Sequence, residues 1–325
     1  MSLDADTIVD RRRMRRKLTF WRVVAFIVAI AAIGAVAATV TRSGPDFVQG
    51  AYTARVTIRG LIRNDQERVQ ALDRLARSSA RAVILHIDSP GGTTAGAEQL
   101  FGALTRLKEK KPLVVVIDGL AASGGYIAAI SADQIVAQST SLVGSIGVLF
   151  QYPNLTDLLK TIGVKVEEIK SSPLKAAPNA FEPTSPEARA ALEAIVLDSY
   201  AWFRGLVSDR RQVDGALLER VADGRVFTGR QAVELKLVDQ LGDERTAIAW
   251  LAKEKNVPAN TPVRDYQLRT RFSDLTFLHL AAVVTLEAVG LRSFAQRIEH
   301  WGAVQAVERL NLDGLLALWH PPTAN

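Results

Sequence analysis

A serine set among small residues is the feature of this sequence best suited to chemistry. Residues 118–126 read DGLAASGGY, with Ser123 between two alanines and two glycines. They follow the β-branched run 113–117, typical of a buried strand, and lead into the apolar run 126–130. At such a strand-to-helix turn a serine exposes its hydroxyl, and free N–H groups at the helix start face a developing negative charge. The alternative is a tight turn whose small residues only permit close packing.

A second glycine turn lies ahead of this one. Residues 82–87 predict a buried strand that ends in Asp88-Ser89-Pro90-Gly91-Gly92, and residues 95–108 predict the helix that follows. Strand, helix and strand in this order predict a parallel α/β sheet, in which both turns lie at the carboxyl ends of strands. A backbone N–H of the second turn can therefore face the site of Ser123. The alternatives are a plain loop that needs positive φ and a phosphate loop, which the missing Lys-Ser/Thr ending disfavours.

A serine hydroxyl needs a neighbouring base before it becomes a strong nucleophile. Of the four histidines, His86 lies within a predicted strand and is expected to be a satisfied core histidine, while His279, His300 and His320 belong to the C-terminal tail. This distribution weakens a Ser-His-Asp reading without excluding it, because triads assemble from distant segments.

A lysine that burial keeps neutral can serve instead. The candidates are Lys160, Lys165, Lys170 and Lys175. The first two lie among residues that look solvated. Lys175 lies in the short-side-chain segment 171–178 with no adjacent acid, which slightly favours it over Lys170.

Composition limits the remaining options. The chain has 325 residues, 48% of them hydrophobic, and it has no cysteine, which excludes disulfides, thiolate metal sites and a cysteine nucleophile. The formal net charge is +6, but residues 1–40 alone carry +4. The rest of the chain is therefore nearly neutral, which argues against nucleic-acid binding.

The positive charge at the N-terminus precedes an apolar run. Residues 23–40 are uninterrupted by charge, and residues 18–21 extend the run across Arg22. This is long enough for a transmembrane helix, with Trp21 as an interfacial anchor. The basic cluster before it predicts a cytoplasmic N-terminus. A cleaved signal peptide is the alternative, with a small-residue cleavage site at 35–38.

Four motifs in order closely resemble the bacterial signal peptide peptidase A family (peptidase family S49). They are Asp88-Ser89-Pro90-Gly91-Gly92, Ala121-Ala122-Ser123-Gly124-Gly125-Tyr126, Gly144-Ser145-Ile146-Gly147-Val148 and Ala222-Asp223-Gly224-Arg225-Val226-Phe227-Thr228-Gly229. The resemblance covers about residues 51–251. It implies a Ser/Lys-dyad serine protease in the single-domain form, whose α/β core is a crotonase-like (ClpP-type) parallel sheet preceded by one transmembrane helix.

The resemblance also assigns roles. Ser123 matches the nucleophile, Lys175 the general base and Ser145 the residue that hydrogen-bonds the base. Gly92 and Gly124 match the backbone donors of the oxyanion hole. No metal or organic cofactor is implied.

One segment departs from the family. The family often reads Gly-Lys-Tyr-Lys where this chain reads Ser172-Pro173-Leu174-Lys175. The first lysine is absent, which makes Lys175 the less ambiguous match unless the alignment slips to Lys170.

The remaining segments complete the predicted organisation. A long helix is predicted over residues 187–207 after the cap Ser185, and a short helix after Thr228. The C-terminal tail is expected to form amphipathic helices on the membrane or on a neighbouring subunit. The predicted parts are a cytoplasmic N-terminus (1–17), a transmembrane anchor (18–40), a linker (41–50), a protease domain (51–255) and a C-terminal helical extension (256–325).

The sequence thus predicts a membrane-anchored serine endopeptidase that degrades remnant signal peptides. By resemblance it is expected at the bacterial inner membrane, with a periplasmic catalytic domain, as a dome-like homo-octamer with inward-facing active sites. Three alternatives stay open: a protease that trims other membrane proteins, a crotonase-type acyl-CoA enzyme without the dyad, and a scaffold that keeps the turns for packing only.

Overall fold

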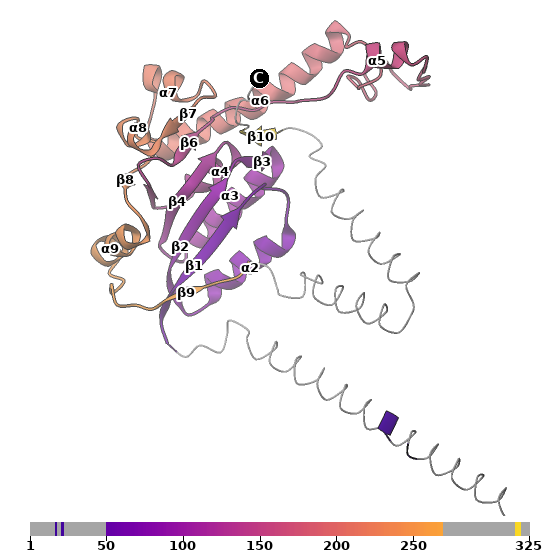
Figure 1. The fold of residues 1–325 in the computed structure, drawn as a ribbon. Helices are drawn as coiled ribbons and strands as arrows, with labels where there is room; N and C mark the ends of the chain where they lie inside the picture. Colours follow the sequence, from indigo (N-terminus) through magenta and orange to yellow (C-terminus); the bar gives the residue numbers. More distant parts are fainter. Residues whose placement is uncertain (1–16, 18–20, 23–49, 269–315, 320–325) are drawn as a thin grey trace, which may run out of the picture. The chain divides into compact units, whose positions relative to one another are not determined.

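The computed structural model describes residues 17, 21–22, 50–268 and 316–319 of the chain (Figure 1). The chain divides into two units, Met1–Gly50 and Ala51–Asn325, and nearly all described residues belong to the second. The strands are β1 (Tyr52–Arg59), β2 (Ala80–Ser89), β3 (Gly91–Thr93), β4 (Leu113–Ala122), β5 (Gln134–Ala137), β6 (Leu142–Gly144), β7 (Val226–Thr228), β8 (Gln240–Leu241), β9 (Val263–Asp265) and β10 (Leu316–Leu318). The helices are α2 (Gln66–Arg77), α3 (Thr94–Lys108), α4 (Gly124–Ala129), α5 (Thr156–Thr161), α6 (Pro186–Arg211), α7 (Gly215–Val221), α8 (Gly229–Glu234) and α9 (Glu244–Glu254).

The main sheet of the second unit is almost entirely parallel, which confirms the predicted α/β class. Its strand order is β7-β6-β4-β2-β1-β9, with β5 also paired to β4 and β8 paired to β5. Every pairing in it is parallel except that of β6 with β7. β4 lies at the centre and ends where the candidate nucleophile begins.

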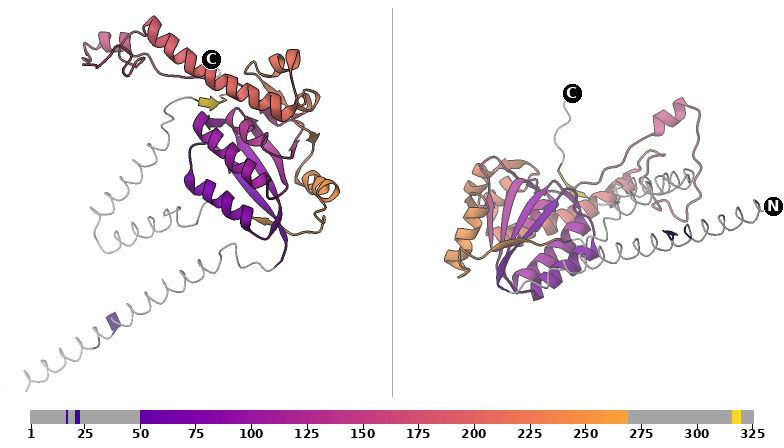
Figure 2. Two further views of the ribbon diagram at one scale, coloured as in Figure 1. Left: turned by 180° about the vertical axis from the view of Figure 1, so that it is seen from behind. Right: turned by 60° about the horizontal axis from the view of Figure 1, so that its bottom comes forward.

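Helices cover both faces of this sheet (Figures 1 and 2). The larger apolar cluster joins α2, α3, α4 and the C-terminal half of α6 to one face, with Leu85 and Ile87 of β2 among its members. Ile84 on the same strand belongs to the second cluster, which α9 closes on the other face. Alternate residues of β2 are buried on opposite faces, as expected for a strand covered on both sides.

β4 is longer than the predicted strand 113–117. Its first half pairs with β5, and its last three residues pair with β6 instead. On the β2 side the register shifts, so that Ile87 faces Ile117 while Ser89 faces Ala121. This irregularity lets the strand continue through the small residues that the sequence predicts as a turn.

The predicted helix starts are confirmed. The Ser185 hydroxyl accepts a hydrogen bond from the N–H of Ala188 at 3.1 Å, at the start of a helix that extends four residues beyond the predicted end. Thr228 forms a capping box with Gln231. Both signals act within one helical turn, which is why the sequence predicts them.

The segment 256–325 differs from the predicted helical extension. Residues 263–265 form β9 beside β1, and residues 316–318 form β10 beside β3. Both strands are only three residues long, so pairing partners rather than local periodicity decide their state. The predicted C-terminal helices fall mostly in residues 269–315, outside the described part.

The predicted anchor over residues 18–40 also lies outside the described residues, apart from Trp21 and Arg22. Among the helices that the structure does describe, none has the length and apolar content needed to cross a bilayer.

A charged network links α9 to the sheet on the face away from α3. His86 lies between two carboxylates, with its Nδ1 2.9 Å from Asp118 and its Nε2 2.8 Å from Glu244. The Arg55 guanidinium donates two hydrogen bonds to the same Glu244 carboxylate, at 2.5 and 2.6 Å, and one to the Asp265 carboxylate at 2.8 Å. Both ring nitrogens of His86 are thus occupied, so this residue is a satisfied structural histidine and is not free to serve Ser123.

This network makes stability sensitive to acid. The Arg55 hydrogen bonds hold the pKa of the Glu244 carboxyl below its ordinary value of 4.5. Protonation therefore costs the folded state more than the unfolded state, so the stabilisation is complete above about pH 4.5 and is lost as the pH falls further. We expect Glu244→Gln to lower the midpoint of urea unfolding at pH 7 and to flatten its decline between pH 5 and pH 3. An unchanged decline would show that Glu244 does not link proton binding to folding.

Candidate active site

Ser123 lies at the turn between β4 and α4 in a strained backbone conformation. Its φ and ψ are 53° and −118°, and its side chain is 1% exposed. Its N–H donates to the carbonyl of Gly144 at 2.8 Å, and its own carbonyl accepts from Tyr126 and Ile127 at 2.9 and 3.0 Å. A serine on a sharp, strained strand-to-helix turn is the geometry of a nucleophile elbow. The backbone conformation thus fixes where the hydroxyl points.

Glycine is required beside the nucleophile because the helix approaches β2 very closely. A Cβ on Gly125 would lie 2.7 Å from the carbonyl oxygen of Ser89. The Ser89 hydroxyl donates to the carbonyl of Gly60 at 2.7 Å and accepts from the N–H of Gly91 at 3.1 Å. This buried serine therefore connects the second glycine turn to Gly60, the residue that follows β1.

Gly92 lies on β3, and one edge of β3 runs along the backbone of Ile62. A Cβ at this position would stand 1.8 Å from the Ile62 carbonyl oxygen. Ile62 forms backbone hydrogen bonds with the two neighbours of Gly92. The Ile62 N–H donates to the carbonyl of Gly91, and the Ile62 carbonyl accepts from the N–H of Thr93. The N–H and C=O of Gly92 itself consequently point to the opposite edge of β3. Gly124 begins α4, where N–H groups lack partners within the helix.

The third motif lies against Ser123, as the resemblance implies. Gly144 accepts the Ser123 N–H, and the next residue, Ser145, is 8% exposed with a φ of 53°. The Ser145 N–H donates to the carbonyl of Arg225, which holds the fourth motif in place. The Ser123 hydroxyl lies 3.5 Å from the carbonyl oxygen of Gly147. Four sequence motifs thus meet at one end of the sheet.

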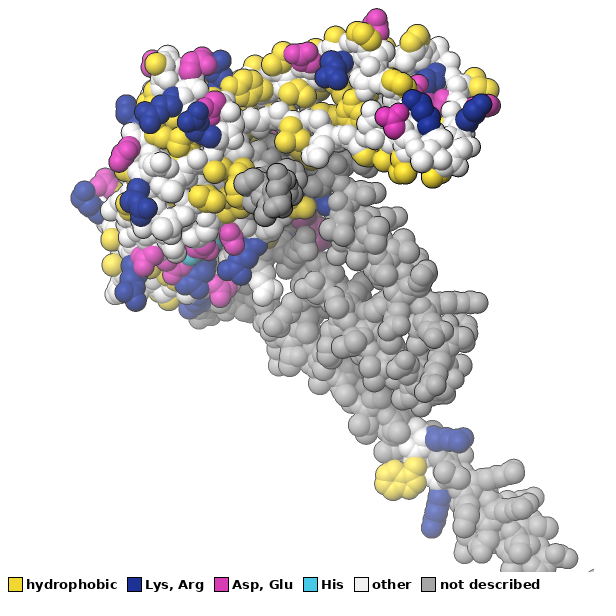
Figure 3. All heavy atoms as spheres, turned by 45° about the horizontal axis from the view of Figure 1, so that its top comes forward, with side chains coloured by type: hydrophobic (Ala, Val, Ile, Leu, Met, Phe, Trp, Pro, Cys, Tyr) yellow, Lys and Arg dark blue, Asp and Glu magenta, His cyan; other side chains and the backbone are white. Residues whose placement is uncertain are grey.

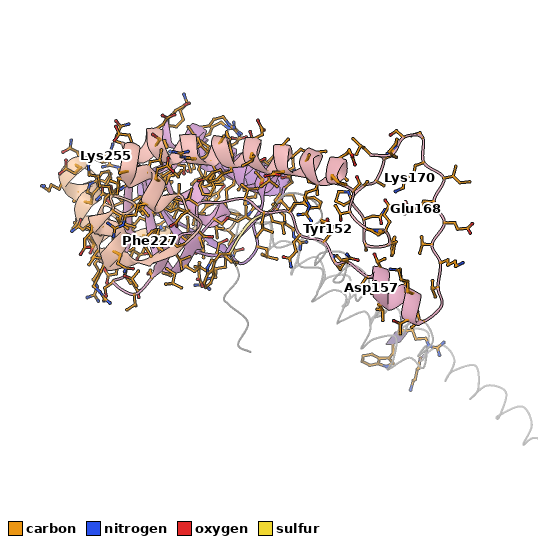
Figure 4. The ribbon with its side chains drawn as sticks, turned by 90° about the horizontal axis from the view of Figure 1, so that it is seen from above. Tyr152, Asp157, Glu168, Lys170, Phe227 and Lys255 are labelled. Carbon is orange, nitrogen blue, oxygen red and sulfur yellow. The ribbon has the colours of Figure 1, made fainter. Side chains whose placement is uncertain are left out.

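Lys175 is not part of this cluster. It lies in residues 151–185, here called the arm, which hold α5 and lead into α6. Figure 4 shows Lys170 of the arm beyond the end of α6, at the opposite side of the unit from Phe227. Phe227 marks the Ser123 site, because a Cβ on Gly144 would lie 3.1 Å from its ring. Within one chain, the predicted base is therefore remote from the predicted nucleophile.

The two leading candidate lysines, Lys170 and Lys175, differ in their environment. The Lys170 ammonium is paired with Glu168 at 2.8 Å and with Glu182, and these hydrogen bonds raise its pKa. Lys175 is exposed, and no carboxylate pairs with it in the described part of the chain. An ion-paired lysine stays protonated and makes a poor base. The arm therefore favours Lys175 over the alternative Lys170.

Asn179 holds the turn that carries Lys175, and the sequence reasoning did not single it out. Its side-chain amide donates to the carbonyl of Ala176 at 3.2 Å and to Glu182 at 3.0 Å. Its side-chain carbonyl accepts from Phe181 at 2.8 Å. Ala176 has a φ of 58°, so the turn needs such support. The signal in the sequence is asparagine itself, whose side chain often hydrogen-bonds the backbone two residues further along the chain.

α4 is fixed at its far end as well. The Arg210 guanidinium donates to the carbonyls of Ile130, Ser131 and Ala132, at 2.8, 3.2 and 3.1 Å. A cation on these terminal carbonyls completes the C-terminal end of a short helix. Near its start, the Tyr126 hydroxyl donates to the backbone carbonyl of Leu237 at 2.8 Å. Burial raises the pKa of this hydroxyl. The helix that presents Gly124 is thereby anchored at both ends.

Comparison with known proteins identifies the family. The model for peptidase family S49 matches residues 105–258. A candidate protease from Synechocystis sp. is 36% identical over 201 residues, covering 61% of this chain and 73% of that protein. A candidate signal peptide peptidase from Enterococcus faecium is 31% identical over 202 residues, covering 62% and 59%. The chloroplast serine protease SPPA of Arabidopsis thaliana is 35% identical over 184 residues, covering 56% and 27%.

The chain belongs to peptidase family S49 and is a serine peptidase of that family. It spans most of the Synechocystis relative but only about a quarter of the Arabidopsis protein. Among solved structures, ClpP1 from Listeria monocytogenes covers 59% of this chain and 93% of its own at 14% identity, with a TM-score of 0.38. This score is too low to support an argument, so the narrower crotonase or ClpP assignment remains a prediction.

The close approach at Gly125 gives a stability test. We expect Gly125→Ala to destabilise the fold by about 1–3 kcal/mol, because the new methyl meets backbone that cannot move aside. Gly205→Ala is the matched control, since nothing lies within 4 Å of a Cβ there and the residue is inside α6. That variant should be stabilised by roughly 0.5–1 kcal/mol. Urea unfolding measures both, and equal effects would contradict the packing described.

Proposed function

We propose that the chain is a serine endopeptidase in which Ser123 of one copy works with Lys175 of a neighbouring copy. The observation that carries the proposal is the buried, strained Ser123 at the start of α4, beside the glycine turns that supply backbone N–H donors. Membership of peptidase family S49 sets the reaction class.

In the proposed mechanism, neutral Lys175 takes the proton of the Ser123 hydroxyl. The oxygen attacks the substrate carbonyl carbon, and the N–H groups of Gly92 and Gly124 stabilise the oxyanion. The C–N bond then breaks, and Lys175 returns the proton to the leaving amine. Water hydrolyses the acyl-enzyme with Lys175 again acting as base. Ser145 accepts a hydrogen bond from the lysine and orients it.

The arm supports assembly between copies. It carries Lys175 away from Ser123 of the same chain, and it exposes many large apolar side chains (Figure 3). Those on the arm are Leu158, Ile162, Val164, Val166, Ile169, Leu174 and Phe181. An exposed apolar surface of this kind favours contact with another protein. A neighbouring copy that covers the arm would also desolvate Lys175, and desolvation keeps an amine neutral.

The substrates are proposed to be remnant signal peptides, with the chain anchored in the bacterial inner membrane by residues 18–40 and the catalytic unit on the periplasmic side. The apolar run 23–40 after a basic cluster supports the anchor. One relative carries the name of a candidate signal peptide peptidase, which supports the substrate class. We also propose a homo-octamer with its active sites inside. Trimming of other membrane proteins is the alternative that the same site would serve.

Mixing two inactive variants tests the shared site. Ser123→Ala should lower kcat by at least about a thousandfold, and Lys175→Ala by roughly 10²–10⁴. Co-assembled from separately purified chains, the two should regain activity, because some neighbours then pair an intact serine with an intact lysine. Hydrolysis of an apolar fluorogenic peptide measures the recovery.

The control mixture combines Ser123→Ala with the double variant Ser123→Ala/Lys175→Ala, which contains no intact serine and should stay inactive. Lys170→Ala should keep most of its activity, because that lysine is ion-paired. Failure of the first mixture to regain activity in mixed oligomers confirmed by native mass spectrometry would exclude a site shared between copies.

A further inference from the structure

Two backbone hydrogen bonds hold the end of β6 from opposite edges. On one side the carbonyl of Gly144 accepts the N–H of Ser123 at 2.8 Å. On the other side the N–H of Ser145 donates to the carbonyl of Arg225 at 2.8 Å, immediately before β7. Figure 1 shows β6 and β7 side by side. The Arg225 carbonyl thus bonds the residue next to the one that holds the proposed nucleophile.

The backbone of Ser145 needs this support because it is strained. Its φ is 53°, a left-handed conformation that a residue with a side chain adopts only where its surroundings impose it. β6 ends at Gly144, so the bond from Ser145 to Arg225 lies at the open end of the ladder between β6 and β7. The position of the Arg225 carbonyl therefore helps to set the direction of the Ser145 side chain.

A tight turn over residues 223–225 positions that carbonyl. The Asp223 carboxylate accepts the N–H of Arg225 at 3.1 Å and pairs with the Arg225 guanidinium at 2.5 Å. Gly224 between them has a φ of 91°. The turn is also fixed where it begins, because the Tyr200 hydroxyl of α6 donates to the carbonyl of Ala222 at 2.7 Å. An aspartate that bonds the backbone two residues further along is a common way to close such a turn.

Of the two contacts that Asp223 makes, the one to the backbone is expected to matter more. The ion pair is exposed, with 35% of the Asp223 side chain and 63% of the Arg225 side chain accessible to solvent. Exposed ion pairs contribute little. The bond to the Arg225 N–H, in contrast, restrains the same residue whose carbonyl meets Ser145.

We propose that Asp223 is a positioning residue of the active site. Its carboxylate fixes the turn, the turn fixes the Arg225 carbonyl, and this carbonyl holds Ser145 in the conformation in which its hydroxyl meets the base. Asp223 acts through Ser145 and not on the reacting atoms. The role of the Ser145 hydroxyl rests on the proposed function, whereas the backbone bond from Ser145 to Arg225 does not.

A double-mutant cycle tests this route. Asp223→Ala should lower kcat for an apolar fluorogenic peptide by about 10–100-fold with KM nearly unchanged, because a misplacement of about 1 Å costs up to about 10²-fold in rate. Ser145→Ala keeps the backbone bond, removes the hydroxyl and should lower kcat at least as much. The double variant should be no slower than Ser145→Ala alone, because the effects of residues that act through one another do not add.

Matched variants separate the turn from its charge. Asp223→Asn keeps an oxygen for the Arg225 N–H and should retain most of the activity. Gly224→Ala strains the same turn by another route, because its φ of 91° disfavours a side chain although nothing lies within 4 Å of a Cβ there. It should behave as Asp223→Ala does in both backgrounds. Two controls should keep the kcat of the wild type: Asp214→Ala, whose carboxylate caps nothing at α7, and Gly215→Ala, also at positive φ with open space around a Cβ.

Hydrogen exchange at the Ser145 amide of the full-length protein gives a readout that does not depend on catalysis. Asp223→Ala should speed this exchange by at least about tenfold, because the bond to Arg225 then opens more often. Asp223→Asn should leave it unchanged. An unchanged exchange rate in both Asp223→Ala and Gly224→Ala would overturn the support of Ser145 by the turn.

The kinetic cycle decides the remaining step. Losses of kcat that multiply in the double variant would overturn the route through Ser145. If exchange at Ser145 responds as expected but the wild-type protein hydrolyses no peptide, the support of Ser145 by Asp223 stands and the proposed function fails instead.

Discussion

The site depends on one backbone conformation, the positive φ of Ser123 at the end of β4. Such a conformation costs a side-chain-bearing residue on the order of 1–3 kcal/mol, and it persists only where the surroundings impose it. Here the Ser123 N–H is bonded to Gly144, and its carbonyl accepts the first bonds of α4. Gly125 lets that helix lie against β2, and Arg210 completes its other end. These contacts hold a buried hydroxyl beside the third motif, 3.5 Å from the carbonyl oxygen of Gly147.

The same arrangement explains why we propose a base from a neighbouring copy. The proposed nucleophile and its proposed donors lie at strand and helix termini of the sheet unit, whereas the proposed base lies on the arm. Lys170 is paired with Glu168 and Glu182, whereas Lys175 has no carboxylate partner in the described chain. A base supplied across a subunit contact would make hydrolysis depend on assembly.

Features set by local sequence could be predicted. The buried strand before Ser123 and the helix starts at Ser185 and Thr228 each follow from residues within one or two turns. The meeting of the two glycine turns also followed, because parallel strands bring their carboxyl ends to one edge. Features set by distant pairing could not. The change of partner along β4 depends on β5 and β6, and three-residue strands such as β10 carry no periodic signal. The separation of Lys175 from Ser123 depends on the direction in which α6 leaves the sheet.

The proposed dyad can be tested by the reaction of the assembled, full-length protein with a fluorophosphonate probe, followed by peptide mapping. We expect a single adduct on Ser123, formed at a rate that rises with pH through one deprotonation and that falls strongly in Lys175→Ala. An adduct on another serine, or an unchanged rate in Lys175→Ala, would contradict it.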